Sequence, residues 1–153
     1  MISPYIKNIR EKIGHELLLL PSVTILCFDE NNSVLLAKHS NNQVWVAPGG
    51  MIEPDETPTD AAKREMLEET GCEIELVKMV GGFAGPEFRI LYQNGDETAY
   101  VMLVYIAKIV GGQIKPDGEE ILEIGFFTYE ETKQLHCGRW LPTVLANVFD
   151  KHK

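Results

Sequence analysis

The stretch from Gly49 to Cys72 places the strongest constraint on how this chain can fold. It begins within a Pro-Gly-Gly sequence, continues as an acidic loop, and then has the composition of a helix that ends at Gly71. Thr57 can cap that helix, and Pro58 suits its first position. The stretch therefore predicts a sharp glycine turn, whose backbone can come close to a ligand, followed directly by a helix.

Three glutamates lie near the end of the predicted helix: Glu65, Glu68 and Glu69. Because an α-helix advances about 100° per residue, all three share one face within one turn. Like charges at this spacing cost roughly 0.2–0.5 kcal/mol per pair. The pattern has two interpretations, a solvated acidic face or a site for Mg²⁺ or Mn²⁺, which prefer oxygen ligands.

The net charge of the chain limits its partners. A formal charge of −9 over 153 residues argues against a nucleic-acid groove, which needs a basic surface. An anionic substrate would need a metal ion or a local group of Arg and Lys side chains in order to approach. The length fits one domain, and no stretch reaches the roughly 20 apolar residues of a membrane span. We therefore predict neither nucleic acid nor a membrane as a partner.

The cysteines and the first residues indicate the compartment. Cys27, Cys72 and Cys137 are odd in number, far apart and without a CxxC pair, which predicts neither a zinc site nor a disulfide framework. The four leucines at residues 17–20 are too few for a secretion signal and follow charged residues. We expect a cytoplasmic protein.

Hydrophobic periodicity and turn signals predict a mixed arrangement of strands and helices. Strands are expected at residues 22–28, 33–38, 44–47, 73–80, 87–92, 98–110 and 121–127, and helices at 4–16, 58–70, 140–149 and from 128. The first two strands are predicted to form a hairpin after a break at Leu20-Pro21, and Asn94-Gly95-Asp96 signals another turn. Without regular βαβ alternation, the order predicts a mixed sheet with helices on both sides.

The first 20 residues form a predicted helical extension before the main domain at residues 21–153. Ile6, Ile9 and Ile13 recur at helical spacing between charged residues. This apolar stripe has two interpretations: it packs on its own domain, or it forms the contact of a homodimer.

A nine-position pattern identifies a known family. It reads Gly, five residues, Glu, seven residues, and then Arg-Glu-apolar-any-Glu-Glu-any-Gly-apolar. This sequence matches it with Gly50, Glu56 and the run from Arg64 to Cys72, which resembles the signature of the Nudix (MutT-like) hydrolases. The resemblance implies an α/β (α+β) fold, a Nudix-type α/β/α sandwich with a mixed β-sheet between helices.

The resemblance also implies an activity. Nudix enzymes hydrolyse a nucleoside diphosphate linked to another group, X, by attack of water on phosphorus with Mg²⁺ or Mn²⁺. By this resemblance Glu65, Glu68 and Glu69 are expected to bind the metal, and the Gly49 carbonyl is expected to add a main-chain ligand. Glu65 is one candidate for the general base. The alternative is a catalytically silent Nudix domain that binds a nucleotide.

Further site residues follow from the same resemblance. Glu56 stands at another acidic position of the signature, and Arg64 is expected to hold the acidic residues in place by pairing with Glu56 or Glu68. Many members add a carboxylate from a late loop, and Glu120 matches that position best, with Glu119 as the alternative. A solvated loop is the competing interpretation.

Substrate contacts must come from outside the signature. The candidates are Trp45, Phe88, Arg89 and Tyr92. Trp45 has the alternative of filling the core, and Arg89 that of a surface ion pair. Pro86 lies 14 residues after the signature, where members acting on ADP-ribose often carry a proline at about 16, so we do not assign that substrate. The histidines are scattered and give no signal of their own. The sequence therefore predicts a nucleotide-type substrate without identifying X.

Overall fold

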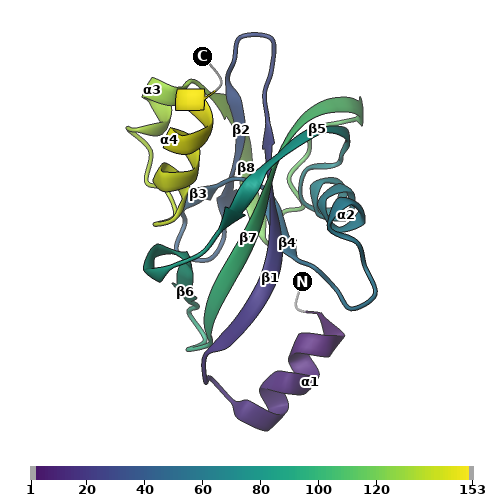
Figure 1. The fold of residues 1–153 in the computed structure, drawn as a ribbon, viewed down its shortest axis with the longest axis vertical. Helices are drawn as coiled ribbons and strands as arrows, with labels where there is room; N and C mark the ends of the chain where they lie inside the picture. The colour runs from purple at the N-terminus through teal and green to yellow at the C-terminus, as the bar shows by residue number, and fades with distance from the viewer. Residues whose placement is uncertain (1–2, 152–153) are drawn as a thin grey trace.

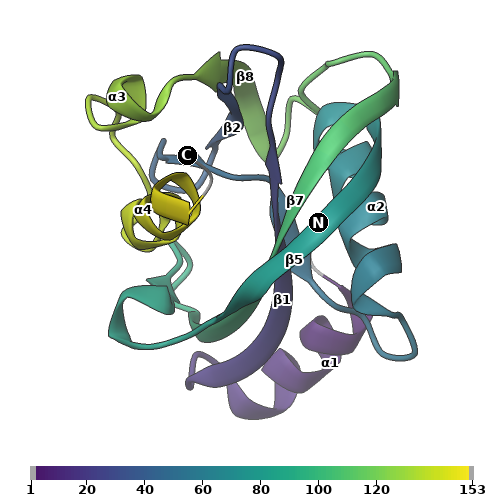
Figure 2. The same ribbon diagram turned by 45° about the horizontal axis from the view of Figure 1, so that its top comes forward.

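A mixed sheet and a smaller antiparallel sheet form the centre of the molecule, with helices on both sides (Figures 1 and 2). The computed structural model describes residues 3–151. The larger sheet has the order β4-β1-β7-β5, with β6 also paired to β7. Its strands are β1 (Leu18–Cys27), β4 (Gly49–Met51), β5 (Cys72–Phe83), β6 (Arg89–Leu91) and β7 (Glu97–Gly112). The smaller sheet has the order β3-β2-β8, formed by β2 (Val34–His39), β3 (Trp45–Val46) and β8 (Ile121–Phe127).

The helices cover the two sides unequally. They are α1 (Pro4–Ile13), α2 (Pro58–Thr70), the 3-10 turn η1 (Pro86–Phe88), α3 (Tyr129–Thr132) and α4 (Leu141–Lys151). In Figure 1, α2 lies on one side of the larger sheet, and α3 and α4 lie on the other. Because β1 and β7 run parallel while the remaining pairs are antiparallel, the predicted mixed sheet between helices is confirmed.

Two hydrophobic clusters hold these layers together. Successive residues of β1 point to opposite faces, so Leu26 packs toward α4 whereas Ile25 packs toward α2. The α2 side is closed by Ala61, Ala62 and Met66, all fully buried. Small alanines let the helix backbone lie close to the sheet, which brings the glutamate-bearing part of α2 down to the strand edge.

Both ends of α2 have the chemistry that the sequence predicts. The Thr57 hydroxyl accepts a hydrogen bond from the Asp60 N–H at 3.1 Å, and Pro58 is the first helical residue. At the other end, Gly71 adopts φ 75°, and its N–H bonds to the Leu67 carbonyl at 3.0 Å. These caps fix where the helix starts and stops.

The predicted first hairpin is wrong. β1 and β2 share a single bridge, Phe28 to Val34, and then diverge into different sheets. The Asp29 carboxylate organises the turn by accepting hydrogen bonds from the Asn31 and Ser33 N–H groups. The local turn signal is therefore real. However, both edges of β1 are already taken by β4 and β7, so β2 pairs with β3 and β8 instead.

The predicted break at Leu20-Pro21 is also absent, because β1 continues through Pro21. β4 pairs with β1 only from Ser22 to Thr24, so Pro21 lies just beyond the paired stretch on that side. Its carbonyl accepts from the Ile52 N–H at 3.1 Å. A proline is tolerated in a strand where its missing N–H is not required by a neighbour.

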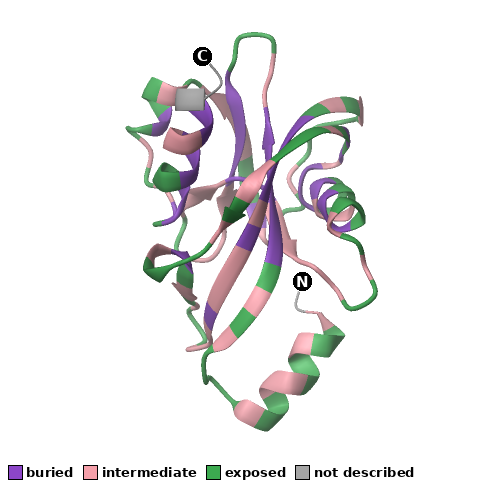
Figure 3. Ribbon diagram, in the orientation of Figure 1, coloured by how far each residue is buried: buried purple, intermediate pink, exposed green. Residues whose placement is uncertain are grey.

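The N-terminal helix α1 lies across the end of the larger sheet, where β1 begins (Figure 1). Across Pro4–Ile13, which the structure describes in full, no residue is buried (Figure 3). Ile6, Ile9 and Ile13 are half-buried, so the apolar stripe faces the protein only loosely. A homodimer through α1 stays a prediction. Within residues 3–151 no helix is long and apolar enough to cross a membrane.

Candidate active site

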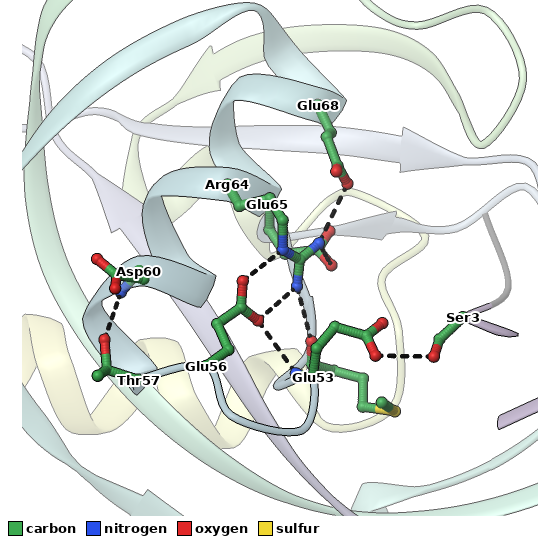
Figure 4. A network of polar contacts seen from close by, with 9 residues as sticks. Ser3, Glu53, Glu56, Thr57, Asp60, Arg64, Glu65 and Glu68 are labelled. Atoms are coloured by element: carbon green, nitrogen blue, oxygen red, sulfur yellow. Dashed lines mark hydrogen bonds and ion pairs between the residues drawn. The ribbon is translucent and has the colours of Figure 1, made fainter. Parts of the chain in front are cut away.

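Arg64 is the centre of a polar network that gathers the acidic residues of α2 and the loop before it (Figure 4). Its guanidinium binds both carboxylate oxygens of Glu56, with Nε–Oε2 at 2.7 Å and Nη2–Oε1 at 2.9 Å. Its Nη1 donates to Glu65 at 2.9 Å and to Glu68 at 3.2 Å, and its Nη2 donates to the Met51 carbonyl at 3.1 Å. One rigid cation therefore links three carboxylates to β4.

The loop before α2 is folded so that Glu56 can meet Arg64. The Glu56 N–H bonds to the Glu53 carbonyl at 3.1 Å, and the Glu53 N–H bonds back to the Glu56 carboxylate at 3.0 Å. Asp55 between them takes φ 67°, a left-handed conformation that Asp tolerates in turns. The hydrogen bond from Arg64 lowers the pKa of Glu56, so this carboxylate stays ionised.

Glu69 is the buried member of the acidic group, with 5% of its surface exposed. Its Oε1 accepts from the Gly49 N–H at 3.1 Å, which joins the helix to β4. Burial first, and then the charge of Glu65, raises the pKa of Glu69 well above its ordinary value. Burial likewise raises the pKa of Glu65 to about 7, against the opposing charge of Arg64. Glu56, Glu65, Glu68 and Glu69 are called the acidic cluster below.

The glycines before the loop serve close approach and not a turn. Gly49 and Gly50 lie in β4, opposite Thr24 and Val23, which corrects the predicted sharp turn. A Cβ on Gly49 would stand 2.1 Å from the Val23 carbonyl oxygen, and one on Gly50 would stand 2.4 Å from Glu65 Oε1. Glycine is required here because both the neighbouring strand and the acidic cluster press against the backbone.

A cavity of about 440 Å³ reaches the acidic cluster. Gly49, Gly50 and Glu69 contribute to its lining. The rest of the wall comes from β1, from β6 and β7, and from two loops beside the smaller sheet. Its polar and aromatic residues include Ser22, Thr24, His39, Asn41, Asn42, Glu87, Arg89, Tyr92, Tyr100, His136, Arg139 and Trp140. Of the acidic cluster, Glu69 thus faces a space of the size that small-molecule sites have.

The four candidate substrate residues have different surroundings. Arg89 and Tyr92 line the cavity, where Arg89 pairs with Glu97 and the Tyr92 hydroxyl bonds to that of Tyr100. The cavity lining, drawn from the described residues, does not include the other two. Trp45 packs edge-on against Phe127 with ring centroids 5.0 Å apart, and Phe88 is buried between Phe83 and Trp140.

Comparison with protein families decides what kind of site this is. The model of the NUDIX domain matches residues 18–145. The chain belongs to the Nudix family. The match includes the acidic cluster and the cavity walls, and it begins at the first residue of β1, after α1. Glu56, Arg64, Glu65, Glu68 and Glu69 are therefore the signature positions of a Nudix domain.

Several known proteins are similar to this chain. A putative 8-oxo-dGTP diphosphatase of Bacillus subtilis (strain 168) is 33% identical over 96 residues, which cover 63% of this chain and 58% of that protein. An ADP-ribose pyrophosphatase of Methanocaldococcus jannaschii is 29% identical over 131 residues, covering 82% and 73%. A solved MutT NUDIX hydrolase from Burkholderia pseudomallei superposes with a TM-score of 0.72 at 20% identity, covering 86% and 98%. The last of these confirms the Nudix α/β/α fold.

The Nudix signature residues fit a hard divalent cation by their chemistry. Within residues 3–151, no three Asp, Glu, His or Cys side chains converge as a ready-made metal site. Arg64 holds the Glu65 and Glu68 carboxylates, and the Gly49 N–H holds Glu69. All the side-chain donors are carboxylates, and two of them have pKa values raised by burial. A cation bound by these carboxylate oxygens would offset the cost of holding their negative charges close together and away from water.

The late acidic loop lies beside the Nudix signature helix. Asp117, after burial and the charge of Glu65, also raises the pKa of Glu69. Its Oδ1 accepts from the N–H groups of Glu119 and Ile121, which holds the turn. Glu120 is half-buried, and its carbonyl accepts from the Ser40 N–H at 2.8 Å. The sequence indicates this loop but gives no reason to prefer Asp117 over Glu119 and Glu120.

Several cavity residues of this Nudix domain were missed from the sequence, among them His39, His136 and Arg139. They lie together because β3 is hydrogen-bonded to a segment distant in the sequence. The Trp45 N–H bonds to the His136 carbonyl at 2.9 Å, and the Gly138 N–H bonds to the Trp45 carbonyl at 3.0 Å. About 90 residues separate the two partners, so no pattern of neighbouring residues in the sequence predicts the contact.

Proposed function

We propose that this Nudix domain hydrolyses a phosphoanhydride bond in a nucleotide-type substrate, a nucleoside diphosphate linked to another group, with Mg²⁺ or Mn²⁺ as cofactor. The observation that carries the proposal is the acidic cluster, which reaches the cavity through Glu69, with the two glycines of β4 also in the cavity lining. A bound divalent cation would neutralise phosphate oxygens and lower the pKa of a water molecule. Water then attacks phosphorus, and the P–O bond of the anhydride breaks.

The residues of the acidic cluster divide the work. Glu65, Glu68 and Glu69 are the proposed metal ligands, together with the Gly49 carbonyl, and Glu120 is the proposed ligand from the late loop. Glu65 is also our candidate base; burial raises its pKa to about 7 in the protein without a bound cation. Glu56 and Arg64 hold the other carboxylates in place.

The remaining cavity wall is proposed to select the substrate. Two of the relatives are named for 8-oxo-dGTP and for ADP-ribose, both nucleotides, which supports a nucleotide-type substrate without identifying X. Arg89 in β6 and Tyr92 in the turn that follows are proposed to contact the substrate. Trp45 and Phe88 would contact it only through a rearrangement of their packing. We also propose a cytoplasmic location, which agrees with the three free cysteines.

Hydrolysis of a substrate panel, with the phosphomonoester, phosphate and pyrophosphate products separated by chromatography, tests the proposal. The panel contains nucleoside triphosphates, ADP-ribose, nucleotide sugars, dinucleoside polyphosphates and NADH, each with Mg²⁺, Mn²⁺ or a chelator. Turnover of at least one compound that stops with the chelator is expected. Binding without turnover across the panel would instead support the silent nucleotide-binding alternative.

Alanine at Gly50 should change activity more than stability. Its Cβ would stand 2.4 Å from Glu65 Oε1, the end of a side chain that can move away, so we expect kcat to fall roughly 10-fold because Glu65 is displaced. At Gly49 the obstacle is the Val23 carbonyl at 2.1 Å, so alanine there should lower the free energy of unfolding by about 1–3 kcal/mol.

Kinetics and urea unfolding of both variants check this contrast. Gly82→Ala is the matched control, because a Cβ there would meet only Leu103 at an ordinary 3.7 Å. Equal loss of stability at Gly49 and Gly50 would contradict the assigned difference between the two contacts.

A further inference from the structure

The N-terminal helix α1 is held mainly by polar contacts at its two ends. None of its residues, all of them described, is buried. At its C-terminal end, Arg10 donates through Nη1 to the Gly14 carbonyl at 3.1 Å and through Nη2 to the Glu97 carbonyl at 2.9 Å and the Thr98 hydroxyl at 3.2 Å. Because so little apolar surface is covered, these polar contacts define where α1 sits.

Ser3 makes the contact at the other end of α1 (Figure 4). Its hydroxyl oxygen accepts from the Tyr5 and Ile6 N–H groups at 3.1 and 3.4 Å, as a helix cap does. The same hydroxyl donates its proton to Glu53 Oε2 at 2.8 Å. A single side chain therefore starts the helix and ties it to the loop before α2.

That loop leads directly into the acidic cluster. Glu53 and Glu56 exchange two hydrogen bonds, from the N–H of each to the carbonyl or carboxylate of the other. Glu56 in turn receives two hydrogen bonds from Arg64, which also contacts Glu65 and Glu68. An unbroken chain of polar contacts thus runs from Ser3 to the proposed metal ligands.

The Arg10 end of α1 contacts the β6–β7 hairpin, which supplies part of the cavity wall. Glu97, whose carbonyl accepts from Arg10, pairs through its side chain with Arg89 of the cavity lining. Tyr92 and Tyr100 lie on the two arms of the same β6–β7 hairpin and also line the cavity. α1 therefore bridges the loop of the acidic cluster and the hairpin of the substrate wall.

We propose that α1 is a strap that ties the loop before α2 to the β6–β7 hairpin, and that Ser3 is a positioning residue, acting through Glu53 and Glu56 on the Arg64 guanidinium. The proposal rests on the proposed hydrolase function for its effect on rate. α1 lies before residue 18, where the NUDIX match begins, so the strap is a feature of this chain outside the matched domain. Loss of the Ser3–Glu53 contact lets the loop and Glu56 move, and Arg64 then holds its carboxylates less well.

Three substitutions of Ser3 in the full chain separate capping from the contact with Glu53. Thr keeps both functions, Ala loses both, and Asp keeps a capping oxygen but has no proton to donate and repels Glu53. We expect Ser3→Ala and Ser3→Asp each to lower kcat about 3- to 10-fold with KM within about twofold, and Ser3→Thr to match the unmodified chain. Lys7→Ala, an exposed change on the same helix, is the control.

Amide hydrogen exchange in metal-free protein without substrate gives a second readout. The Glu53 N–H, bonded to the Glu56 carboxylate, should exchange several-fold faster in Ser3→Ala and Ser3→Asp, and unchanged in Ser3→Thr. Because this measurement needs no turnover, it tests the strap even if the panel shows no hydrolysis and the proposed function fails. Faster exchange with unchanged kcat would overturn the positioning role.

The Asp variant decides the remaining alternative. If Ser3→Asp behaves like the unmodified chain in both measurements, Ser3 is a helix cap alone and the strap proposal is wrong. A double-mutant cycle combines Glu53→Ala with Ser3→Ala. The Glu53→Ala single variant removes the contact with Ser3 but leaves the Ser3 helix cap intact. A coupling of zero for kcat would also contradict the proposal.

Discussion

Replacing Glu69 with Gln is expected to lower kcat roughly 10²- to 10³-fold while making the protein more stable. Gln has the same shape, and its carbonyl oxygen can still accept from the Gly49 N–H. What it removes is the negative charge at the buried end of the acidic cluster. The loss of rate should therefore come from the charge and not from a change in the fold.

The gain in stability follows from the environment of Glu69. Because burial raises the pKa of this side chain well above its ordinary 4.5, the unfolded chain releases a proton that the folded chain retains. Rising pH above about 4.5 therefore favours the unfolded chain of the unmodified protein. Gln has no proton to release, so the stability difference should grow between pH 5 and pH 8.

Urea unfolding at pH 5 and pH 8, together with kcat at pH 8, measures both effects. Glu68→Gln is the matched control, since its side chain is 52% exposed and its charge is solvated. That variant should lose activity without the gain in stability. Full activity of both glutamine variants would refute the proposed metal ligands.

Replacing Arg64 with Ala is expected to damage activity and stability together. The guanidinium bonds to three carboxylates and to the Met51 carbonyl. Its removal leaves the partly buried Glu65 without its cationic partner and Glu56 with only the Glu53 N–H. We expect the free energy of unfolding to fall by about 2–3 kcal/mol, which lowers Tm by roughly 5–10 °C. Because Arg64 holds the proposed metal ligands in place, its loss should also lower kcat roughly 10- to 100-fold.

Arg64→Lys separates charge from geometry. Lys retains the positive charge but cannot bind Glu56 through two parallel hydrogen bonds, so Tm and kcat should fall between those of the alanine variant and the unmodified chain. Lys63→Ala removes a neighbouring exposed cation and should leave both unchanged. Thermal denaturation and steady-state kinetics make the comparison, and an unchanged Tm for Arg64→Ala would contradict the bracing role.

Local chemistry made much of the signature helix predictable. The cap at Thr57, the stop at Gly71 and the shared face of the glutamates all depend on residues within one or two turns of one another. The same local logic failed for the first hairpin, because the competition for β1 is decided by β7, more than 70 residues away. Glycine at 49 and 50 signalled a special backbone, but only the packed structure shows which neighbours require it.

The candidate site was predictable at its acidic end and, on the cavity wall, only at Arg89 and Tyr92. The carboxylates and Arg64 are close in sequence and have defined chemical roles, so their spacing is informative. His39 and His136 reach the same cavity through pairing of β3 with a segment about 90 residues later, and the sequence carries no periodic trace of that contact. The sequence does not distinguish Asp117 from the other acidic residues of its loop, because side-chain orientation decides which of them raises the pKa of Glu69.

The division of the strands into two sheets, linked where β1 meets β2 by the single Phe28–Val34 bridge, has a consequence for how such a protein diversifies. The acidic cluster is anchored to the larger sheet, whereas His39, Asn41 and His136 are held by the smaller one. Substitutions in those loops can change the shape and polarity of the cavity without moving a carboxylate of the acidic cluster. A lineage can thus acquire a new substrate while inheriting its chemistry unchanged.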